Sequence, residues 1–316
     1  MPHSREVGIA RIYAALTLHL TDDNGSILTQ KKFTSFVASS QTHLDICVDA
    51  LRELMQERGL DAKEIHGLGI SLPGIVDSDR GVLLYAPYAK WENVPVAEYL
   101  REKLGIANIR CDNDVNACAI GELKFGLGKK YSDFVWMTVS TGVGGASVSD
   151  GTLIRGADGF AGELGHLKVE YDHPAQCPCG QEGCLEAHGS GTALNRLTAK
   201  MAQQDAEFAA ALAQAGSKAD GAGCAKLAQA GNPKALAIFD EIGTYLGRGM
   251  AYCVNVLNPQ AVVVGGGVSA SLELLRPAIT AALKANAFRK MQNIDVVCTP
   301  LGYEAALIGA AALAAE

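Results

Sequence analysis

Hydrophobic and polar residues alternate along the first part of the chain in patterns that predict strands and one helix. Two strands are expected over residues 7–20 and 26–35, joined by the turn at 22–25. A further strand is expected over 65–77, where it runs into a Gly/Pro turn. Residues 41–57 predict an amphipathic helix with one apolar face. The residues on that face are Leu44, Cys47, Val48, Leu51 and Leu54.

The rest of the chain continues to alternate between strands and helices, with glycine-rich turns between them. The expected elements are a strand at 108–114, a helix at 115–126, two strands around a turn within 133–154, a helix at 234–257, a strand at 261–269 and an Ala-rich helix at the C-terminus. Residues 202–233 are interpreted as a helical insertion. This alternation is typical of an α/β protein.

Composition narrows the class of protein. A chain of 316 residues is long enough for two domains, each with its own core. The net charge of −7, without a Lys/Arg-rich run, argues against nucleic-acid binding. No apolar stretch reaches the roughly 18–20 residues that span a membrane, and the N-terminus lacks a secretory signal core. Most of the nine cysteines stand singly, as is typical of reduced thiols, so we expect a cytoplasmic protein.

The remaining cysteines are clustered and have the chemistry of a metal site. His166, Cys177, Cys179 and Cys184 match a closed Cys₃His zinc site, and four protein ligands would make that zinc structural. His173 is an alternative fourth ligand. Reduced, metal-free thiols are the other interpretation of the same spacing.

Two carboxylates accompany this cluster. Glu163 and Glu186 stand at its two ends in the sequence, so a bound metal would fix the loops that carry them. Carboxylates accept hydrogen bonds from hydroxyl groups, and a ring of such acceptors is what a sugar requires. The stretch is therefore interpreted as a metal-stabilised polyol site.

Three segments resemble the ROK family of bacterial sugar kinases and sugar-responsive repressors. They are CDNDVNACAIGELKFG at 111–126, STGVGGASVSDGTLIRGADGFAGELGH at 140–166 and CPCGQEGCLE at 177–186. The segments at 71–81, 91–95 and 262–269 also fit, so the resemblance covers most of the chain from about residue 65.

The resemblance implies an actin-like α/β fold with the active site in a cleft between two domains. We expect an N-terminal domain of residues 1–112 plus 302–316 and a larger C-terminal domain of residues 113–301. A homodimer is a further expectation from the family.

The resemblance also implies a general base and sugar ligands. Asp114 falls where the family keeps the base that takes a proton from the sugar hydroxyl as it attacks the γ-phosphorus. The alternative for Asp114 is a helix N-cap. The residues that match sugar ligands are Gly74, Asn113, Asp114, Glu163, His166 and Glu186. His166 would use one ring nitrogen for zinc and the other for sugar.

Glycine-rich turns match the nucleotide site of the family. Backbone N–H groups in such turns can face anionic oxygens without interference from a side chain. The phosphate loop is expected to contain Thr141, Gly142, Gly144 and Gly145. The turn beside the adenosine is expected to contain Gly265, Gly266 and Gly267. A plain glycine-rich hairpin and simple strand–helix packing are the respective alternatives.

One family motif is missing. ROK kinases open with Asp-x-Gly-Gly-Thr, which helps hold Mg²⁺ and the ATP phosphates, whereas residues 7–16 contain no Asp, Gly pair or Thr. Arg11 could contact phosphate but cannot replace a metal-binding carboxylate.

The first hypothesis is a kinase that uses ATP with Mg²⁺ to phosphorylate a hexose or N-acylhexosamine, with the 6-hydroxyl as the expected acceptor. The second is a catalytically impaired sugar-binding pseudokinase or regulator. Only about six residues precede the first strand, so no DNA-binding domain is expected.

Overall fold

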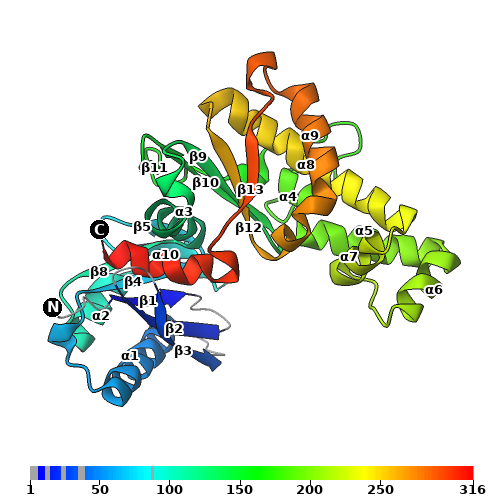
Figure 1. Ribbon diagram of the computed structural model, residues 1–316. Coiled ribbons are helices and arrows are strands. Elements are labelled where there is room, and N and C mark those ends of the chain that lie inside the picture. The colour runs from blue at the N-terminus through cyan, green and yellow to red at the C-terminus, as the bar shows by residue number, and fades with distance from the viewer. Residues whose placement is uncertain (1–5, 11–14, 23–25, 35–39, 87–88, 316) are drawn as a thin grey trace. The chain divides into compact units, whose positions relative to one another are not determined.

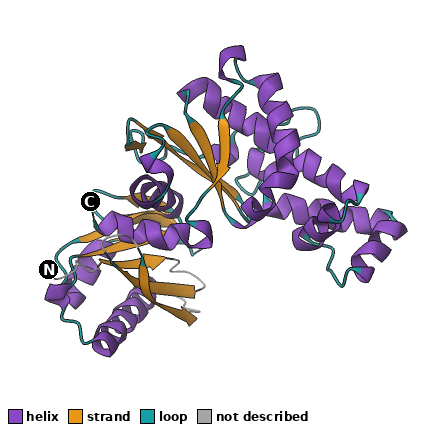
Figure 2. Cartoon of the chain, in the orientation of Figure 1, coloured by secondary structure: helices purple, strands orange, loops and turns teal. Residues whose placement is uncertain are grey.

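The computed structural model describes residues 6–10, 15–22, 26–34, 40–86 and 89–315. The chain forms two compact units, and strands and helices mix in both (Figure 1, Figure 2). Unit 1 consists of residues 1–132, 150–161 and 299–316, and unit 2 of residues 133–149 and 162–298.

Unit 1 is built on a mixed five-stranded sheet with the order β3-β2-β1-β4-β8. Its strands are β1 (Glu6–Ala10), β2 (Ala15–Thr21), β3 (Ile27–Thr34), β4 (Gly67–Leu72) and β8 (Ile109–Asn113). A small antiparallel sheet contains β5 (Ile75–Asp77), β6 (Val82–Ala86) and β7 (Trp91–Val94). The helices are α1 (Ser40–Arg58), α2 (Val96–Leu104), α3 (Asp114–Phe125) and α10 (Ala305–Ala314).

The expectation of a single strand over residues 7–20 is wrong. The segment contains two antiparallel strands, β1 and β2, in which Val7 pairs with Leu20 and Ala10 with Thr17. The segment has no Gly, Pro, Asn or Asp near its middle, so it gives no local signal for a reversal. Residues 11–14, which include Arg11, lie outside the described residues.

Close backbone packing places α3 and α10 together in unit 1. A Cβ atom on Gly309 would lie 2.1 Å from the carbonyl oxygen of Ala117, and one on Gly121 would lie 2.8 Å from the Cα of Gly309. Only glycine permits helices to approach so closely. This packing joins residues 113–132 to unit 1, whereas the expected domain division assigns them to the second domain.

Unit 2 is built on four neighbouring strands of a second sheet, in the order β10-β9-β12-β13. These strands are β9 (Phe134–Val139), β10 (Val143–Ser149), β12 (Ala261–Gly265) and β13 (Asp295–Cys298). The short strand β11 (Thr152–Ile154) belongs to unit 1. The helices of unit 2 are α4 (Leu185–Gly189), α5 (Gly191–Gln204), α6 (Ala206–Gln214), α7 (Gly221–Gln229), α8 (Pro233–Leu257) and α9 (Leu272–Asn286). The helical character expected for residues 202–233 is confirmed by α6 and α7.

The core of unit 2 includes the apolar face of α8. Phe239, Ile242 and Leu246 on this helix are at most 1% exposed, and they belong to one cluster with Val262 and Val264 of β12. Among the described residues, no helix has the length and apolar character needed to cross a membrane.

Candidate active site

The turn from β8 into α3 carries the predicted base. Asn113 is the N-cap of α3, because its Oδ1 accepts hydrogen bonds from the backbone N–H of Val115 at 2.8 Å and of Asn116 at 3.3 Å. Asp114 is the first residue of the helix, and its Oδ1 accepts from Val115 N at 3.1 Å. The alternative role of Asp114 as N-cap is therefore wrong, because Asn113 holds that position.

The structure brings Gly74 against this turn. The Asn113 side-chain amide donates to the carbonyl oxygen of Gly74 at 2.9 Å. Gly74 has a φ of 148°, and a Cβ atom there would lie 2.6 Å from the carbonyl oxygen of Tyr85. Both the backbone conformation and the available space therefore require glycine at this position. Gly74, Asn113 and Asp114 form one local cluster in unit 1.

An ion pair behind this turn was missed by the sequence analysis. Asp112 is 1% exposed, and its Oδ2 lies 2.5 Å from Nη2 of Arg155. Its Oδ1 accepts from the backbone N–H of Asn113 at 2.7 Å and from the side-chain amide of Asn116 at 2.9 Å. Arg155 Nε also donates to the Ser78 hydroxyl at 3.0 Å. The available signal was an acidic residue within the strand predicted at 108–114, since acidic side chains are rarely buried unless paired.

The predicted metal ligands meet in unit 2. The ligand atoms of His166, Cys177, Cys179 and Cys184 all lie within 4.8 Å of one another. The Sγ atoms of Cys179 and Cys184 are 3.8 Å apart, and Cys177 Sγ is 3.8 Å from His166 Nδ1. Zn–S bonds of about 2.3 Å in a tetrahedron place sulfurs about 3.8 Å apart. The donor set and its spacing therefore fit a zinc ion.

Local backbone geometry builds this cluster. Cys177 N–H donates to the carbonyl oxygen of Gln181 at 2.8 Å, and Gly180 N–H donates back to Cys177 at 3.0 Å. Gly180 has a positive φ of 87°, which closes the turn. Burial raises the pKa of the Cys177 thiol to about 12, so a metal that binds there must displace a proton.

The other two histidines of this region have different surroundings. His173 is exposed and is not a member of the ligand cluster, so the structure selects His166 as the histidine of the cluster. His188 is buried, accepts a hydrogen bond at Nε2 from Ala175 N–H at 3.0 Å, and packs against the ring of Tyr245.

His166 presents its two ring nitrogens to different groups. Nδ1 faces the Cys177 sulfur, whereas Nε2 lies 3.7 Å from Oε2 of Glu163. The side chain of His166 is 39% exposed and that of Glu163 is 65% exposed, so both are accessible to a ligand. This orientation leaves Nε2 available for a hydroxyl group when Nδ1 binds a metal.

Glu186 connects the cluster to the glycine loop. It lies in the first turn of α4, whose N-cap is Cys184, one of the predicted metal ligands. Its Oε2 accepts a hydrogen bond from Val143 N–H at 3.1 Å, and its Oε1 is 4.0 Å from Cys177 Sγ. A Cβ atom on Gly142 would lie 2.2 Å from Oε2, so only glycine leaves room for the carboxylate here. The structure thus brings Glu163, His166 and Glu186 together beside the loop at Gly142.

The expected nucleotide residues divide into two groups. Thr141, Gly142 and Gly267 line pockets at the surface of unit 2. Gly144, Gly145, Gly265 and Gly266 lie in or next to β10 and β12. Three of these glycines also allow a neighbour to pack closely. An added Cβ atom would collide with Leu164 at Gly145, with Trp136 at Gly265 and with Val139 at Gly266.

A pocket of about 520 Å³ joins the Thr141 loop to the Gly267 turn. Its size falls in the range of small-molecule sites. The N-termini of α5 and α7 both border it, and helix N-termini favour anions. Its lining includes residues that the sequence analysis did not select, because only the fold brings them together. These are Ser140, Gly191, Thr192, Asn195, Gly221, Lys226, Gln229 and Ser271.

The Thr141 loop is fixed to the start of α5. Gly191 N–H donates to the carbonyl oxygen of Ser140 at 2.7 Å, and the Thr192 hydroxyl donates to that of Thr141 at 2.7 Å. The loop therefore has a defined backbone conformation at the pocket wall.

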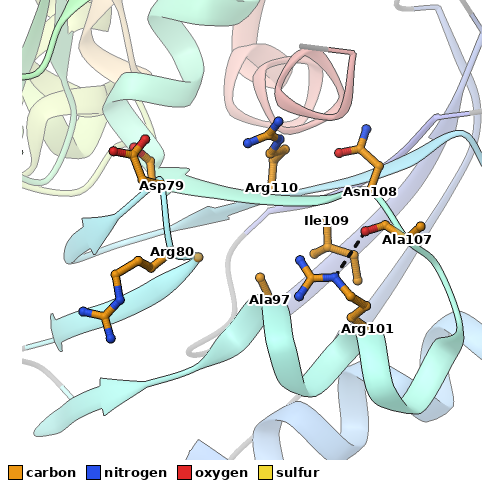
Figure 3. Close-up of a pocket in the computed structure, with 10 residues that line it drawn as sticks. Asp79, Arg80, Ala97, Arg101, Ala107, Asn108, Ile109 and Arg110 are labelled. Carbon is orange, nitrogen blue, oxygen red and sulfur yellow. Dashed lines mark hydrogen bonds between the residues drawn. The ribbon is translucent and has the colours of Figure 1, made fainter.

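A smaller pocket of about 210 Å³ lies in unit 1 and contains none of the predicted site residues (Figure 3). Arg101 donates from Nε to the carbonyl oxygen of Ala107 at 3.2 Å, and Arg80 and Arg110 extend away from each other. The arginines do not converge on one point.

Comparisons with known proteins place this geometry in a family. A family model described as ROK family matches residues 7–316. A glucokinase from Thermotoga maritima is 32% identical over 319 residues, which cover 100% of this chain and 99% of that protein. A xylose repressor from Caldicellulosiruptor bescii is 30% identical over 85% of this chain and 67% of the repressor.

Solved structures agree. A ROK family glucokinase from Streptomyces griseus, in complex with glucose and AMPPNP, is 30% identical, covers 99% of each chain and superposes with a TM-score of 0.83. A ROK hexokinase from Thermus thermophilus is also 30% identical, with a TM-score of 0.78 and 98% of each chain covered. These matches confirm the expected actin-like α/β fold. The chain belongs to the ROK family.

Proposed function

We propose that the protein is an ATP-dependent sugar kinase that phosphorylates a hexose or N-acylhexosamine, with the 6-hydroxyl as acceptor. The observation that carries the proposal is the β8–α3 turn: Asn113 supplies the helix cap, so the capping role does not fall on the carboxylate of Asp114. The similarity to glucokinases over the whole chain supports the same activity.

In this proposal Asp114 takes the proton from the attacking hydroxyl. Asn113 and the backbone at Gly74 orient the sugar, and so do the carboxylates of Glu163 and Glu186 and Nε2 of His166. The exposure of Glu163 and His166 supports this role. A hydroxyl held by several acceptors attacks in one orientation, which supplies a large part of the rate enhancement in phosphoryl transfer.

The pocket between Thr141 and Gly267 is proposed to bind ATP. Two helix N-termini and the backbone of the loop suit its phosphates. Phosphate charge is neutralised by Mg²⁺ when ATP binds. The family's aspartate ligand for that ion is not found in residues 7–16, which contain no Asp.

A zinc ion is proposed at His166, Cys177, Cys179 and Cys184. Four protein donors leave no open position, so this ion would hold the loops of Glu163 and Glu186 and take no part in the reaction. The 3.8 Å spacing of the donors supports this assignment.

A second candidate function is sugar binding without phosphorylation. It is favoured by residues 7–16, which contain no Asp, Gly pair or Thr where the family carries Asp-x-Gly-Gly-Thr, and by the similarity to a xylose repressor.

We further propose a cytoplasmic homodimer. Exposed apolar residues on α8, such as Val256 at 80% exposure, support an interface, which sedimentation would test.

ADP release from ATP and Mg²⁺, measured across hexoses and N-acetylhexosamines, separates the two functions. We expect release that depends on one sugar class and is lost in Asp114→Asn, whose amide keeps the size of the carboxylate but cannot accept the proton. Calorimetric sugar binding is measured on both proteins as the control for folding. Sugar binding without ADP release in the wild type would refute the kinase and support the binding protein.

A further inference from the structure

We propose that Asp112 and Arg155 form a positioning pair that fixes the orientation of Asp114 without touching the sugar. The inference rests on the proposed function, because it assigns these residues a task in the same reaction. Both residues lie in unit 1, 43 positions apart in the sequence.

Asp112, on strand β8, stabilises the β8–α3 turn through hydrogen bonds. One carboxylate oxygen accepts from Asn113 N–H and from the Asn116 side chain, so it bonds to residues on both sides of Asp114. The backbone N–H of Asn116 in turn donates to Asn113 Oδ1. A displacement of Asp112 would therefore move Asn113, the helix cap and the first turn of α3 together.

Arg155 fixes the second oxygen of Asp112. The side chain of Asp112 is 2% exposed and that of Arg155 is 33% exposed, so the pair is largely removed from water. A buried carboxylate without its partner is strongly unfavourable and would rearrange or gain a proton. The position of the turn thus depends on a cation from a distant segment.

Arg155 also connects the turn to two other segments. Its Nε donates to the Ser78 hydroxyl in the β5–β6 hairpin, and its backbone oxygen accepts from Ala161 N–H at 3.0 Å. Asn113 reaches the same hairpin region through Gly74. The hairpin, the 155–161 loop and the base are therefore held by one set of polar contacts.

This arrangement predicts a specific kinetic effect. A base that is displaced by about 1 Å can cost about 100-fold in rate, whereas sugar affinity also depends on groups in unit 2. Loss of the pair should lower kcat strongly and change the sugar Kd little. A residue that only stabilises the fold would lower the amount of active protein without changing its kinetics.

The test compares Arg155→Met with Arg155→Lys. Arg155→Met removes the cation at similar length, and Arg155→Lys retains a charge that can reach Asp112 but loses the paired contact to Ser78. Lys31→Met is the matched control, because Lys31 pairs with Glu53 at 2.8 Å in the same unit, on β3. kcat, sugar KM, calorimetric Kd and amide hydrogen exchange are measured on each.

We expect Arg155→Met to lower kcat about 10- to 100-fold, with sugar Kd within about threefold of wild type. Arg155→Lys should recover part of kcat. Amide exchange should accelerate at Val115 and Asn116 in Arg155→Met and stay unchanged in Lys31→Met. A wild-type kcat in Arg155→Met, or an equal loss in Lys31→Met, would overturn the proposal.

Failure of the proposed function gives a different result. If the wild type releases no ADP with any sugar, the kinase assignment fails, and exchange at Val115 and Asn116 still decides whether Arg155 holds the turn. Unchanged exchange at both amides in Arg155→Met would then reject the positioning pair.

Discussion

The substitution Gly142→Ala should weaken the use of sugar while leaving the stability of the fold nearly unchanged. The Cβ of Gly142→Ala would lie 2.2 Å from Oε2 of Glu186. Carbon and oxygen atoms approach to about 3.3 Å, so the carboxylate must retreat by about 1 Å. It is the far end of a flexible side chain, and the backbone can stay in place. We therefore expect a stability change below about 1 kcal/mol.

The functional cost should be larger. A retreat of this size stretches the 3.1 Å hydrogen bond from Val143 N–H to Glu186 beyond its useful range. Glu186 and Gly142 line a surface pocket, so water can replace the carboxylate at Val143 N–H with little loss of stability. If this bond is what holds the carboxylate in place for the sugar, kcat/KM for sugar should fall by up to about 100-fold, because a displacement of about 1 Å can cost that much in rate.

The assay is sugar-dependent ADP release at saturating ATP, with calorimetric sugar binding and denaturant unfolding on the same protein. Gly267→Ala is the control for stability, because no atom lies within 4 Å of its added Cβ. Unchanged sugar kcat/KM and Kd in Gly142→Ala would refute the role of Glu186. A loss of stability as large as the loss of binding would refute the claim that only the side chain moves.

Three further predictions concern the metal, a buried acid and helix packing. Cys179→Ser should lose zinc and expose residues 166–186 to proteolysis, because few buried side chains surround this loop; full zinc content with unchanged protection would contradict the site. Burial raises the pKa of Glu122 in the folded protein above its value in the unfolded chain. Between these two pKa values the unfolded chain has lost a proton that the folded protein still holds, so stability falls as pH rises through this range. Glu122→Gln should lose less stability than the wild type over the same pH range. Parallel curves of unfolding free energy against pH for the two proteins, measured by denaturant unfolding, would refute this. Gly309→Ala should cost about 1–3 kcal/mol in unfolding free energy, because its Cβ would meet the Ala117 backbone; a midpoint equal to that of Gly267→Ala would contradict the packing argument.

Several features could be predicted because their signals are local. The spacing of Cys177, Cys179 and Cys184 already restricts the three sulfurs to one small loop. The helical pattern at 115–126, closed by Gly126 and preceded by a short strand, likewise indicated a strand–helix turn at Asp114. The amphipathic helix predicted at 41–57 is confirmed as α1. It could be predicted for the same reason, because the spacing of its apolar residues is a property of one continuous segment.

Other features depend on residues far apart in the sequence. The choice of His166 over His173 depends on which loop folds back onto the cysteines, and both histidines are close to them along the chain. The sequence between β1 and β2 has no residues typical of a turn. The position of the two strands therefore depends on their pairing with each other, of β1 with β4 and of β2 with β3.

The sequence by itself determined the types of chemistry available to this protein: thiolates and imidazole for a metal, carboxylates for hydroxyl groups and glycine loops for phosphates. Only the tertiary structure decided that Asn113, and not Asp114, caps α3, and that Asp112 pairs with Arg155. The physical reason is that caps and buried ion pairs depend on distances of a few ångströms. The cap depends on the residue at which β8 ends, and the pair of Asp112 and Arg155, 43 residues apart, depends on packing, so neither leaves a pattern in neighbouring residues.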